Sequence, residues 1–258
     1  MTFADIVDRL PAGTTHVHLE RVGSTNAHAL DHDHDWVTAD LQTAGRGRRG
    51  RVWTSPPGNL YASALCRDDA VTRDGLLPLR AGLALHDAVV KIAAAAAPRL
   101  ALKWPNDLLL DGRKVAGLLL EARIQEGHRR LVLGFGVNCA RHPDDALTPA
   151  TDFRSAGLDV PRGALFSALA HALEARLAAI GREETSATVA TWRERAHGIG
   201  APITVRLPTH EIEGRFEDLA ADGRLVLARA DGRREHIAAG DVFFASTRGN
   251  TMTHEATT

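Results

Sequence analysis

Residues 43–59 of this chain read TAGRGRRGRVWTSPPGN, and they follow directly on a predicted strand, Trp36–Gln42. The spacing of the glycines satisfies G-x-G-x-x-G, the dinucleotide-binding fingerprint of a Rossmann fold. In that fold the glycine turn opens a helix whose N-terminus meets the pyrophosphate. Pro56 and Pro57 prevent a helix here, because proline lacks the backbone donor and clashes with the preceding turn. The stretch therefore excludes a Rossmann site and predicts a cationic, glycine-rich loop that follows a strand.

The four arginines of this loop leave three interpretations open: a solvated charged loop, a grip on nucleic acid, and a clasp around a small anion. The chain carries 31 Lys and Arg against 32 Asp and Glu, a formal net charge of −1. Nucleic-acid binding normally leaves a basic footprint over a whole domain, so this balance argues against a general nucleic-acid coat protein. A charged run is most often a solvated surface. Glycines between arginines, however, give a flexible loop of the kind that orders around an anion.

Length and composition limit the class of protein. The 258 residues are 44% hydrophobic and 24% charged, which predicts one large globular domain, or a large domain with a small one. Cys66 and Cys139 are interpreted as buried thiols in a reducing compartment rather than as a disulfide. The N-terminus has no apolar signal-peptide core, and no apolar run reaches the roughly 18 residues of a membrane span. We therefore expect a cytoplasmic protein.

The residue pattern predicts mixed helices and strands followed by a β-rich end. An Ala- and Leu-rich segment predicts a helix over residues 76–97 that Pro98 stops. Asp111-Gly112 predicts a hairpin turn between two apolar runs. After Gly198, short strands joined by Asp-Gly turns predict a small barrel that packs as its own unit. The other predicted elements are strands at 15–22, 36–42 and 59–66, a short helix capped by Ser24 or Thr25, and helices at 162–180 and 186–196.

Two further segments carry candidate binding residues. Lys103 ends a predicted strand just before Trp104-Pro105, where it can present a point charge to a phosphate or carboxylate. A single lysine of this kind is more often a surface residue whose stem covers apolar atoms. Asn106 and Asp107 fit either a turn or a contact to magnesium. Gly134 and Gly136 interrupt an apolar strand, which indicates that a ligand approaches the strand backbone closely.

Four motifs in this order resemble the biotin–protein ligases. They are Gly23-Ser24-Thr25-Asn26, QTAGRGRRG at 42–50, KWPND at 103–107 and GFGVN at 134–138. The resemblance covers residues 15–245, and Gly240-Asp241-Val242 is similar to the family's C-terminal signature. It implies an α/β (α+β) fold, with a mixed-sheet catalytic domain over residues 1–198, an SH3-like β-barrel over 199–247 and a disordered tail over 248–258. Residues 1–14 are too few for a helix-turn-helix, so the chain resembles the monofunctional class.

The resemblance also implies a reaction. Such an enzyme activates biotin with MgATP as biotinyl-5'-AMP and transfers it to a lysine of the biotin carrier domain of acetyl-CoA carboxylase or a related carboxylase. The implied small molecules are therefore ATP, Mg²⁺ and biotin. We expect no nucleic acid and no membrane as partner, and a monomer or a homodimer. The rival interpretations are a lipoate–protein ligase and, in a different class, a ligand-responsive nucleic-acid-binding repressor.

The same resemblance implies roles for individual residues. The implied catalytic residues are Lys103, Arg48 and Arg46, with Lys103 bridging the biotin carboxylate and the α-phosphate. The implied biotin-binding residues are Ser24, Thr25, Asn26, Gln42, Gly45, Arg46, Gly47, Arg48, Lys103, Gly117, Gly134 and Gly136. The implied ATP- and adenylate-binding residues are Arg46, Arg48, Arg49, Trp53, Lys103, Asn106 and Asn138. No metal-ligating residue is assigned. The His- and Asp-rich segment from His28 to Trp36 departs from the family pattern, and we interpret it as a solvated loop rather than a metal site.

Overall fold

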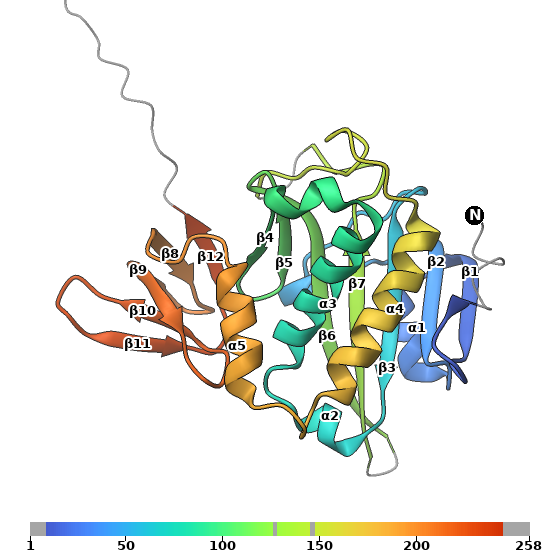
Figure 1. Ribbon diagram of the computed structural model, residues 1–258, viewed down its shortest axis with the longest axis horizontal. Helices are drawn as coiled ribbons and strands as arrows, with labels where there is room; N and C mark the ends of the chain where they lie inside the picture. The colour runs from blue at the N-terminus through green and yellow to red at the C-terminus, as the bar shows by residue number, and fades with distance from the viewer. Residues whose placement is uncertain (1–8, 126–127, 145–147, 245–258) are drawn as a thin grey trace, which may run out of the picture.

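The computed structural model describes residues 9–125, 128–144 and 148–244. A seven-stranded sheet forms its larger part, in the order β1-β2-β3-β7-β6-β5-β4 (Figure 1). Only the β1–β2 pair in this sheet is parallel, so the sheet is mixed as predicted. The strands are β1 (His16–Val22), β2 (Trp36–Gln42), β3 (Leu60–Cys66), β4 (Leu100–Lys103), β5 (Asp107–Leu110), β6 (Arg113–Gln125) and β7 (His128–Val137).

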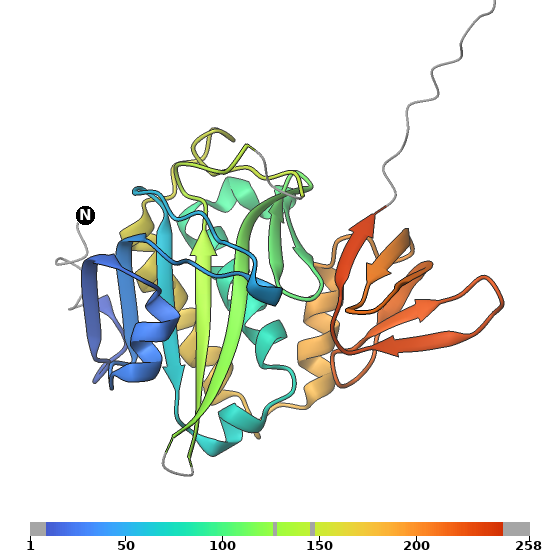
Figure 2. The ribbon, with the colours of Figure 1, turned by 180° about the vertical axis from the view of Figure 1, so that it is seen from behind.

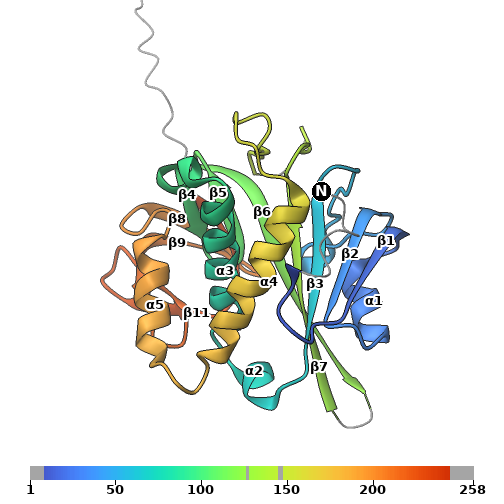
Figure 3. The same cartoon turned by 45° about the vertical axis from the view of Figure 1, so that its right-hand side comes forward.

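Helices cover one face of this sheet and leave much of the other face to loops. Helices α3 (Leu77–Ile92) and α4 (Arg162–Ala178) pack side by side on one face, with α5 (Thr185–Glu194) next to α3 (Figure 3). The short helix α1 (Thr25–Asp31) lies on the opposite face against β2, β3 and β7. Ser24 caps α1, since its side chain accepts a bond from the backbone N–H of Ala27. A further short helix, α2 (Asp69–Arg73), was not predicted.

The predicted helix at 76–97 is shorter in the structure. Helix α3 ends at Ile92, and Ala93 leaves the helical region with φ −138° and ψ 82°. A 3-10 segment (Ala94–Arg99) continues the chain and contains Pro98. The clash between a proline ring and the preceding turn disfavours an α-helix well before the proline itself. The helix prediction was therefore right in kind and too long at its C-terminal end.

The C-terminal region forms its own antiparallel sheet of five strands, in the order β11-β10-β9-β8-β12. Its strands are β8 (Pro202–Arg206), β9 (Glu211–Leu219), β10 (Leu225–Ala228), β11 (Arg234–Ile237) and β12 (Asp241–Phe244). Gly223 and Gly232 adopt positive φ in the β9–β10 and β10–β11 turns, as the Asp-Gly pairs predict. The predicted tail at 248–258 lies outside the described residues.

Both cysteines are buried and unpaired, in agreement with the sequence interpretation. Burial raises the pKa of each thiol, Cys66 and Cys139, to about 12. Among the described residues, no helix is long and apolar enough to cross a membrane.

Candidate functional site

A pocket of about 430 Å³ lies where the open face of the large sheet meets the five-stranded sheet. Figure 2 shows the segment after β2 crossing this face toward the five-stranded sheet before it returns to β3. We call residues 45–55 of this segment the arginine loop. Its turn is a 3-10 element at Arg48–Gly50, and an antiparallel bridge pairs Arg46 with Val52. The loop, the sheet and β12 therefore all contribute walls to one pocket.

Most of the residues singled out from the sequence line this pocket. They are Ser24, Thr25, Asn26, Gln42, Arg46, Gly47, Arg48, Trp53, Lys103, Asn106, Gly117, Gly134, Gly136 and Asn138. Gly45 and Arg49 are not among the lining residues. Gly45 supports the loop instead, because a Cβ there would lie 2.5 Å from the Trp53 carbonyl oxygen and from Ser55 Oγ. Arg49 points its guanidinium to the five-stranded sheet.

A chain of polar side chains forms one end of the pocket. The backbone N–H and the hydroxyl of Thr25 both donate to Gln42 Oε1, at 2.9 and 3.1 Å. Gln42 Nε2 donates to Ser55 Oγ at 3.0 Å, and that hydroxyl donates to the Trp53 carbonyl. Ser63 Oγ lies within hydrogen-bond distance of both the Thr25 hydroxyl and Asn26 Oδ1. The C-terminal base of the arginine loop is thereby tied to helix α1.

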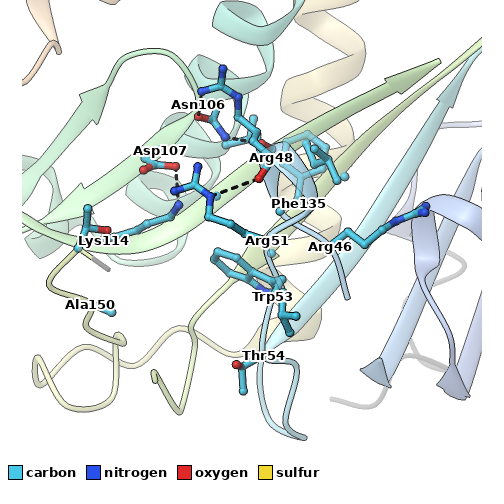
Figure 4. A pocket seen from close by; sticks show the side chains of 18 of the residues that line it. Arg46, Arg48, Arg51, Trp53, Thr54, Asn106, Asp107, Lys114, Phe135 and Ala150 are labelled. Carbon is cyan, nitrogen blue, oxygen red and sulfur yellow. Dashed lines mark hydrogen bonds and ion pairs between the residues drawn. The ribbon is translucent and has the colours of Figure 1, made fainter. Parts of the chain in front are cut away.

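Asn26 and Arg46 meet at one carboxylate. Asn26 Nδ2 donates to Glu121 Oε2 at 2.8 Å, and Arg46 Nη2 lies 3.1 Å from Glu121 Oε1. Figure 4 shows Arg46 extending away from the group formed by Arg48 and Arg51. Arg46 and Arg48, which the resemblance implies for the same catalytic and adenylate-binding roles, therefore lie apart: Arg46 lies at the Asn26 end of the pocket, and Arg48 lies at the other.

Three arginines of the loop converge on Asp241 of β12. The shortest N–O distances from Asp241 are 2.8 Å to Arg51, 3.2 Å to Arg49 and 3.9 Å to Arg48. Arg48 Nη1 also donates to the Gly240 carbonyl and to Asn106 Oδ1. Burial lowers the pKa of Arg48, while Asp241 raises it. The five-stranded sheet thus holds the arginine loop in its folded conformation through charge-assisted hydrogen bonds.

Lys103 lies in the same charged region. Burial lowers the pKa of Lys103, and the carboxylates of Asp107 and Asp241 oppose that shift. Asp107 in turn pairs with Lys114, whose Nζ lies 2.7 Å from Asp107 Oδ1 (Figure 4). Lys114 Nζ also lies 5.3 Å from the centroid of the Trp53 ring. This end of the pocket combines Arg48, Lys103 and Lys114, which suits a polyanion.

The glycines of β6 and β7 make room for side chains of the protein itself. A Cβ at Gly134 would lie 2.3 Å from Asn26 Oδ1. A Cβ at Gly136 would lie 2.5–2.8 Å from three atoms of the Trp53 indole, and one at Gly117 would lie 3.0 Å from the same ring. The close approach expected from the Gly134 and Gly136 pattern is therefore present, and Asn26 and Trp53 are the groups that make it in the described structure.

Sequence reasoning missed four residues that shape the pocket or its loop: Arg51, Lys114, Glu121 and Asp241. Arg51 belongs to the quoted loop, and Asp241 to the Gly-Asp-Val signature, so both were visible but not given a role. Lys114 and Glu121 stand on β6, four residues before and three residues after Leu118. Strand alternation alone does not tell which of them faces a ligand, because that depends on how the sheet curves over the pocket.

The His- and Asp-rich segment holds no candidate metal cluster, and the same is true of all other described residues. His28 and His32 stack with ring centroids 4.0 Å apart, and His34 lies 6.5 Å from His28. Burial and the neighbouring histidines lower the pKa of His28. Asp31 pairs with Arg123 of β6. His28–Asp31 belong to helix α1 rather than to the predicted loop, and none of residues 28–36 lines the pocket.

Comparison with known proteins agrees with this geometry. The model of the biotin/lipoate A/B protein ligase family matches residues 19–138, and that of the biotin protein ligase C-terminal domain matches residues 198–245. A biotin–[acetyl-CoA-carboxylase] ligase of Paracoccus denitrificans is 38% identical over 239 residues, which are 88% of this chain and 99% of the relative. The chain belongs to the biotin/lipoate A/B protein ligase family. It is an enzyme of the ligase class.

One further relative supports the assignment, and a solved structure shows the same fold. A biotin–[acetyl-CoA-carboxylase] ligase of Mycobacterium tuberculosis is 36% identical to this ligase, over 86% of each chain. The solved structure of the biotin protein ligase from Aquifex aeolicus in complex with biotin and ATP superposes with a TM-score of 0.79 at 24% identity. That superposition covers 90% of this ligase and 99% of the Aquifex chain, and it establishes the shared fold. The two chains therefore share one fold over most of their length.

Proposed function

We propose that this ligase activates biotin with ATP as biotinyl-5'-AMP and transfers the biotinyl group to a lysine of the biotin carrier domain of a carboxylase. The observation that carries the proposal is the pocket itself: one end is lined mainly by neutral hydrogen-bonding side chains, with Arg46 paired to Glu121, and the other end is cationic. Its volume of about 430 Å³ lies within the range of small-molecule sites. The relatives at 36–38% identity are named for this activity.

The neutral end fits the ureido group of biotin. A ureido group presents two N–H donors and one carbonyl acceptor, which a dry pocket must match. Thr25, Asn26 and Gln42 are each half-buried or buried there and supply hydroxyl and amide groups. Gly134 lets Asn26 approach the strand backbone, and Gly117 lets the Trp53 indole do so, so that these two side chains bound the space in which a flat bicyclic ring would lie.

The cationic end fits the carboxylate of biotin and the phosphates of ATP. In the first half-reaction the carboxylate oxygen attacks the α-phosphorus, a mixed anhydride forms, and pyrophosphate leaves. Lys103 and Arg48 stabilise the negative charge that builds up on the α-phosphoryl oxygens during this transfer. In the second half-reaction the acceptor amine attacks the biotinyl carbonyl, and AMP leaves. The arginine loop excludes water from the anhydride between the two steps.

Trp53 and Asn138 fit the adenosine. The Trp53 indole offers a flat apolar face beside Lys114, and its N–H meets no acceptor in the described part of the chain. Purine rings bind well against such a face. Asn138, by contrast, is buried and uses its amide to donate to the Thr151 carbonyl, so it shapes the wall rather than offering that donor to ATP.

The cationic end of the pocket offers few oxygen ligands for a magnesium ion. Mg²⁺ in nucleotide sites binds phosphates and waters with one or two carboxylates. Asp107 and Asp241 are the carboxylates that line the pocket, and both are paired with basic side chains. Asn106 and Asp107 would hold the ion, which would neutralise phosphate charge and help pyrophosphate leave. The protein's own lysines and arginines carry most of the countercharge.

The division of the chain is proposed on the same grounds. We place a catalytic domain over residues 1–198 and an SH3-like C-terminal domain over 199–247; the two family models match residues 19–138 and 198–245, which supports a division near residue 198. The acceptor is a separate carrier domain, because the modified lysine of biotin carriers lies in a Met-Lys-Met sequence that this chain lacks. Its two methionines are Met1 and Met252, and neither flanks a lysine. A cytoplasmic location and a monomeric or dimeric state stay predictions from the sequence.

Acid-dependent exchange of pyrophosphate into ATP tests the first half-reaction. We expect exchange with biotin and none with lipoate, and exchange with lipoate alone would assign the chain to the rival activity. Mass measurement of a purified carrier domain after incubation with biotin and ATP tests the transfer. Lys103→Ala should lower exchange by roughly 10²–10³-fold, the usual effect of removing one transition-state donor. Lys91→Ala, an exposed lysine at the end of α3, is the matched control.

A further inference from the structure

The linker between α5 and β8 runs beside β4, the strand that ends at Lys103. The Leu102 N–H donates to the Arg195 carbonyl, and the His197 N–H donates to the Leu102 carbonyl, each at 2.7 Å. A parallel bridge pairs Leu102 with Ala196. Both the N–H and the carbonyl of Leu102, the residue just before Lys103, are therefore hydrogen-bonded to the linker. A shift of the linker moves the backbone from which the Lys103 side chain starts.

Phe244, at the end of β12, packs its ring directly against Gly198 of this linker. Gly198 has φ +80°, and a Cβ there would lie 2.0 Å from Cε1 and 2.6 Å from Cζ of Phe244. A side chain at position 198 would therefore expel the Phe244 ring. The site is open to the ring only because residue 198 is a glycine, and this fixes Phe244 against the linker.

Phe244 touches two groups that carry chemistry. The His197 ring meets it edge-on, with centroids 4.6 Å apart and an angle of 79°. Lys103 Nζ lies 5.8 Å from the centroid of the same ring, within the range of a cation–π contact. The ring is thus shared between a histidine of the linker and the lysine that acts on the reacting atoms.

The charges around these groups favour a neutral His197 beside a charged Lys103. Burial lowers the pKa of His197, and Lys103 lowers it further. Lys103 itself is faced by Asp107 of β5 and Asp241 of β12, which raise its pKa, and by Lys114 of β6 and Arg51 of the loop, which lower it. A proton on His197 would add a fourth cation to Lys103, Lys114 and Arg51 and repel the Lys103 ammonium.

We propose that His197 and Phe244 are positioning residues for Lys103: the neutral histidine holds the aromatic ring that supports the lysine ammonium, and protonation of the histidine disables the site at acid pH. The inference rests on the role proposed above for Lys103. On this inference, β12 and the linker contribute to adenylation through the contacts of Phe244 with His197 and Lys103. Neither residue contacts the substrates, because neither lines the pocket.

The test is the pH profile of biotin-dependent pyrophosphate exchange in the full chain. His197→Gln should extend activity to lower pH, because it removes the proton that repels Lys103, and it should leave the KM for biotin unchanged. Phe244→Leu keeps apolar volume but removes the aromatic face, and it should lower kcat roughly 10- to 100-fold, the scale of a misplaced catalytic group. His236→Gln, an exposed histidine in β11 of the same sheet, is the control.

The outcomes separate this inference from the proposed function. If the wild-type chain shows no biotin-dependent exchange, the proposed function fails, and with it the premise of this inference. If the wild type exchanges and the acid limb of His197→Gln coincides with that of the wild type, the inference is overturned. An effect of Phe244→Leu confined to KM would overturn it as well. Should Phe244→Leu unfold, as judged by its thermal midpoint, the His197→Gln profile decides alone.

Discussion

Arg51 Nη2 lies 2.8 Å from Oδ1 of Asp241, and this contact joins the arginine loop to the five-stranded sheet 190 residues further along the chain. Arg48 and Arg49 approach the same carboxylate. One acidic side chain therefore partly offsets the mutual repulsion of three guanidinium groups. Without it, the loop would have to order its cations around the phosphates alone.

Asp241→Asn should loosen the loop, because the amide keeps the shape of the carboxylate but loses the charge. Hydrogen bonds to charged groups contribute about 1.5–3 kcal/mol, and partial exposure of the arginines reduces that figure. We expect the bound adenylate to dissociate roughly tenfold faster, measured by release of labelled biotinyl-5'-AMP. Asp222→Asn, which breaks a surface pair with Arg224 in the β9–β10 turn, should leave the release rate unchanged.

Comparing Arg48→Gly with Arg49→Gly distinguishes the role of the pocket-facing arginine from that of the arginine facing the five-stranded sheet. Arg48 lines the pocket and donates to Asn106, whereas Arg49 points to the five-stranded sheet and holds φ 56°. We expect Arg48→Gly to release the adenylate, so that biotin labels surface lysines of bystander proteins in a mixed incubation. With Arg49→Gly we expect less biotin labelling of these bystander lysines than with Arg48→Gly. Labelling that remains confined to the carrier domain in both variants would contradict the role given to Arg48.

Gly136→Ala should displace Trp53. The added Cβ would lie 2.5–2.8 Å from indole atoms, and overpacking of this kind costs typically 1–3 kcal/mol. Because we propose that the indole binds the adenosine, we expect the KM for ATP to rise more than the KM for biotin, together with a shift in tryptophan fluorescence. Gly75→Ala is the control, since a Cβ there meets no atom within 4 Å and the residue lacks positive φ. Equal kinetics for both variants would exclude this role of the indole.

The two buried thiols make a prediction about stability at alkaline pH. Burial raises the pKa of Cys66 and Cys139 to about 12, above the ordinary value of 9. Since the unfolded chain loses these protons first, their contribution to stability is complete below about pH 9 and is lost as pH rises toward 12. We expect the free energy of unfolding of Cys66→Ser/Cys139→Ser to fall less steeply over that window. In the folded protein at pH 8 both thiols should resist iodoacetamide.

How much the sequence could predict differs between the ends of the pocket. Ser24, Thr25 and Gln42 follow a recognisable motif, and the structure places all three at the pocket, with Thr25 hydrogen-bonded to Gln42. Arg46 and Arg48 belong to a motif just as clear, yet they point to different ends. Arg46 and Arg48 are separated by one glycine in an irregular loop, and only the partners available in space, here Glu121 and Gly240, select the direction of each side chain.

By itself the sequence determined the local chemistry of this protein. The prolines after the arginine loop excluded a nucleotide-binding helix, Asp111-Gly112 set a hairpin whose two residues adopt positive φ, and the order of motifs identified the family. These features depend on neighbours along the chain, which propensity and turn geometry govern. The tertiary structure alone decided that Asp241 holds the arginine loop and that Phe244 lies between His197 and Lys103. Those contacts join residues far apart in sequence, and only the packing of the two sheets brings them within reach.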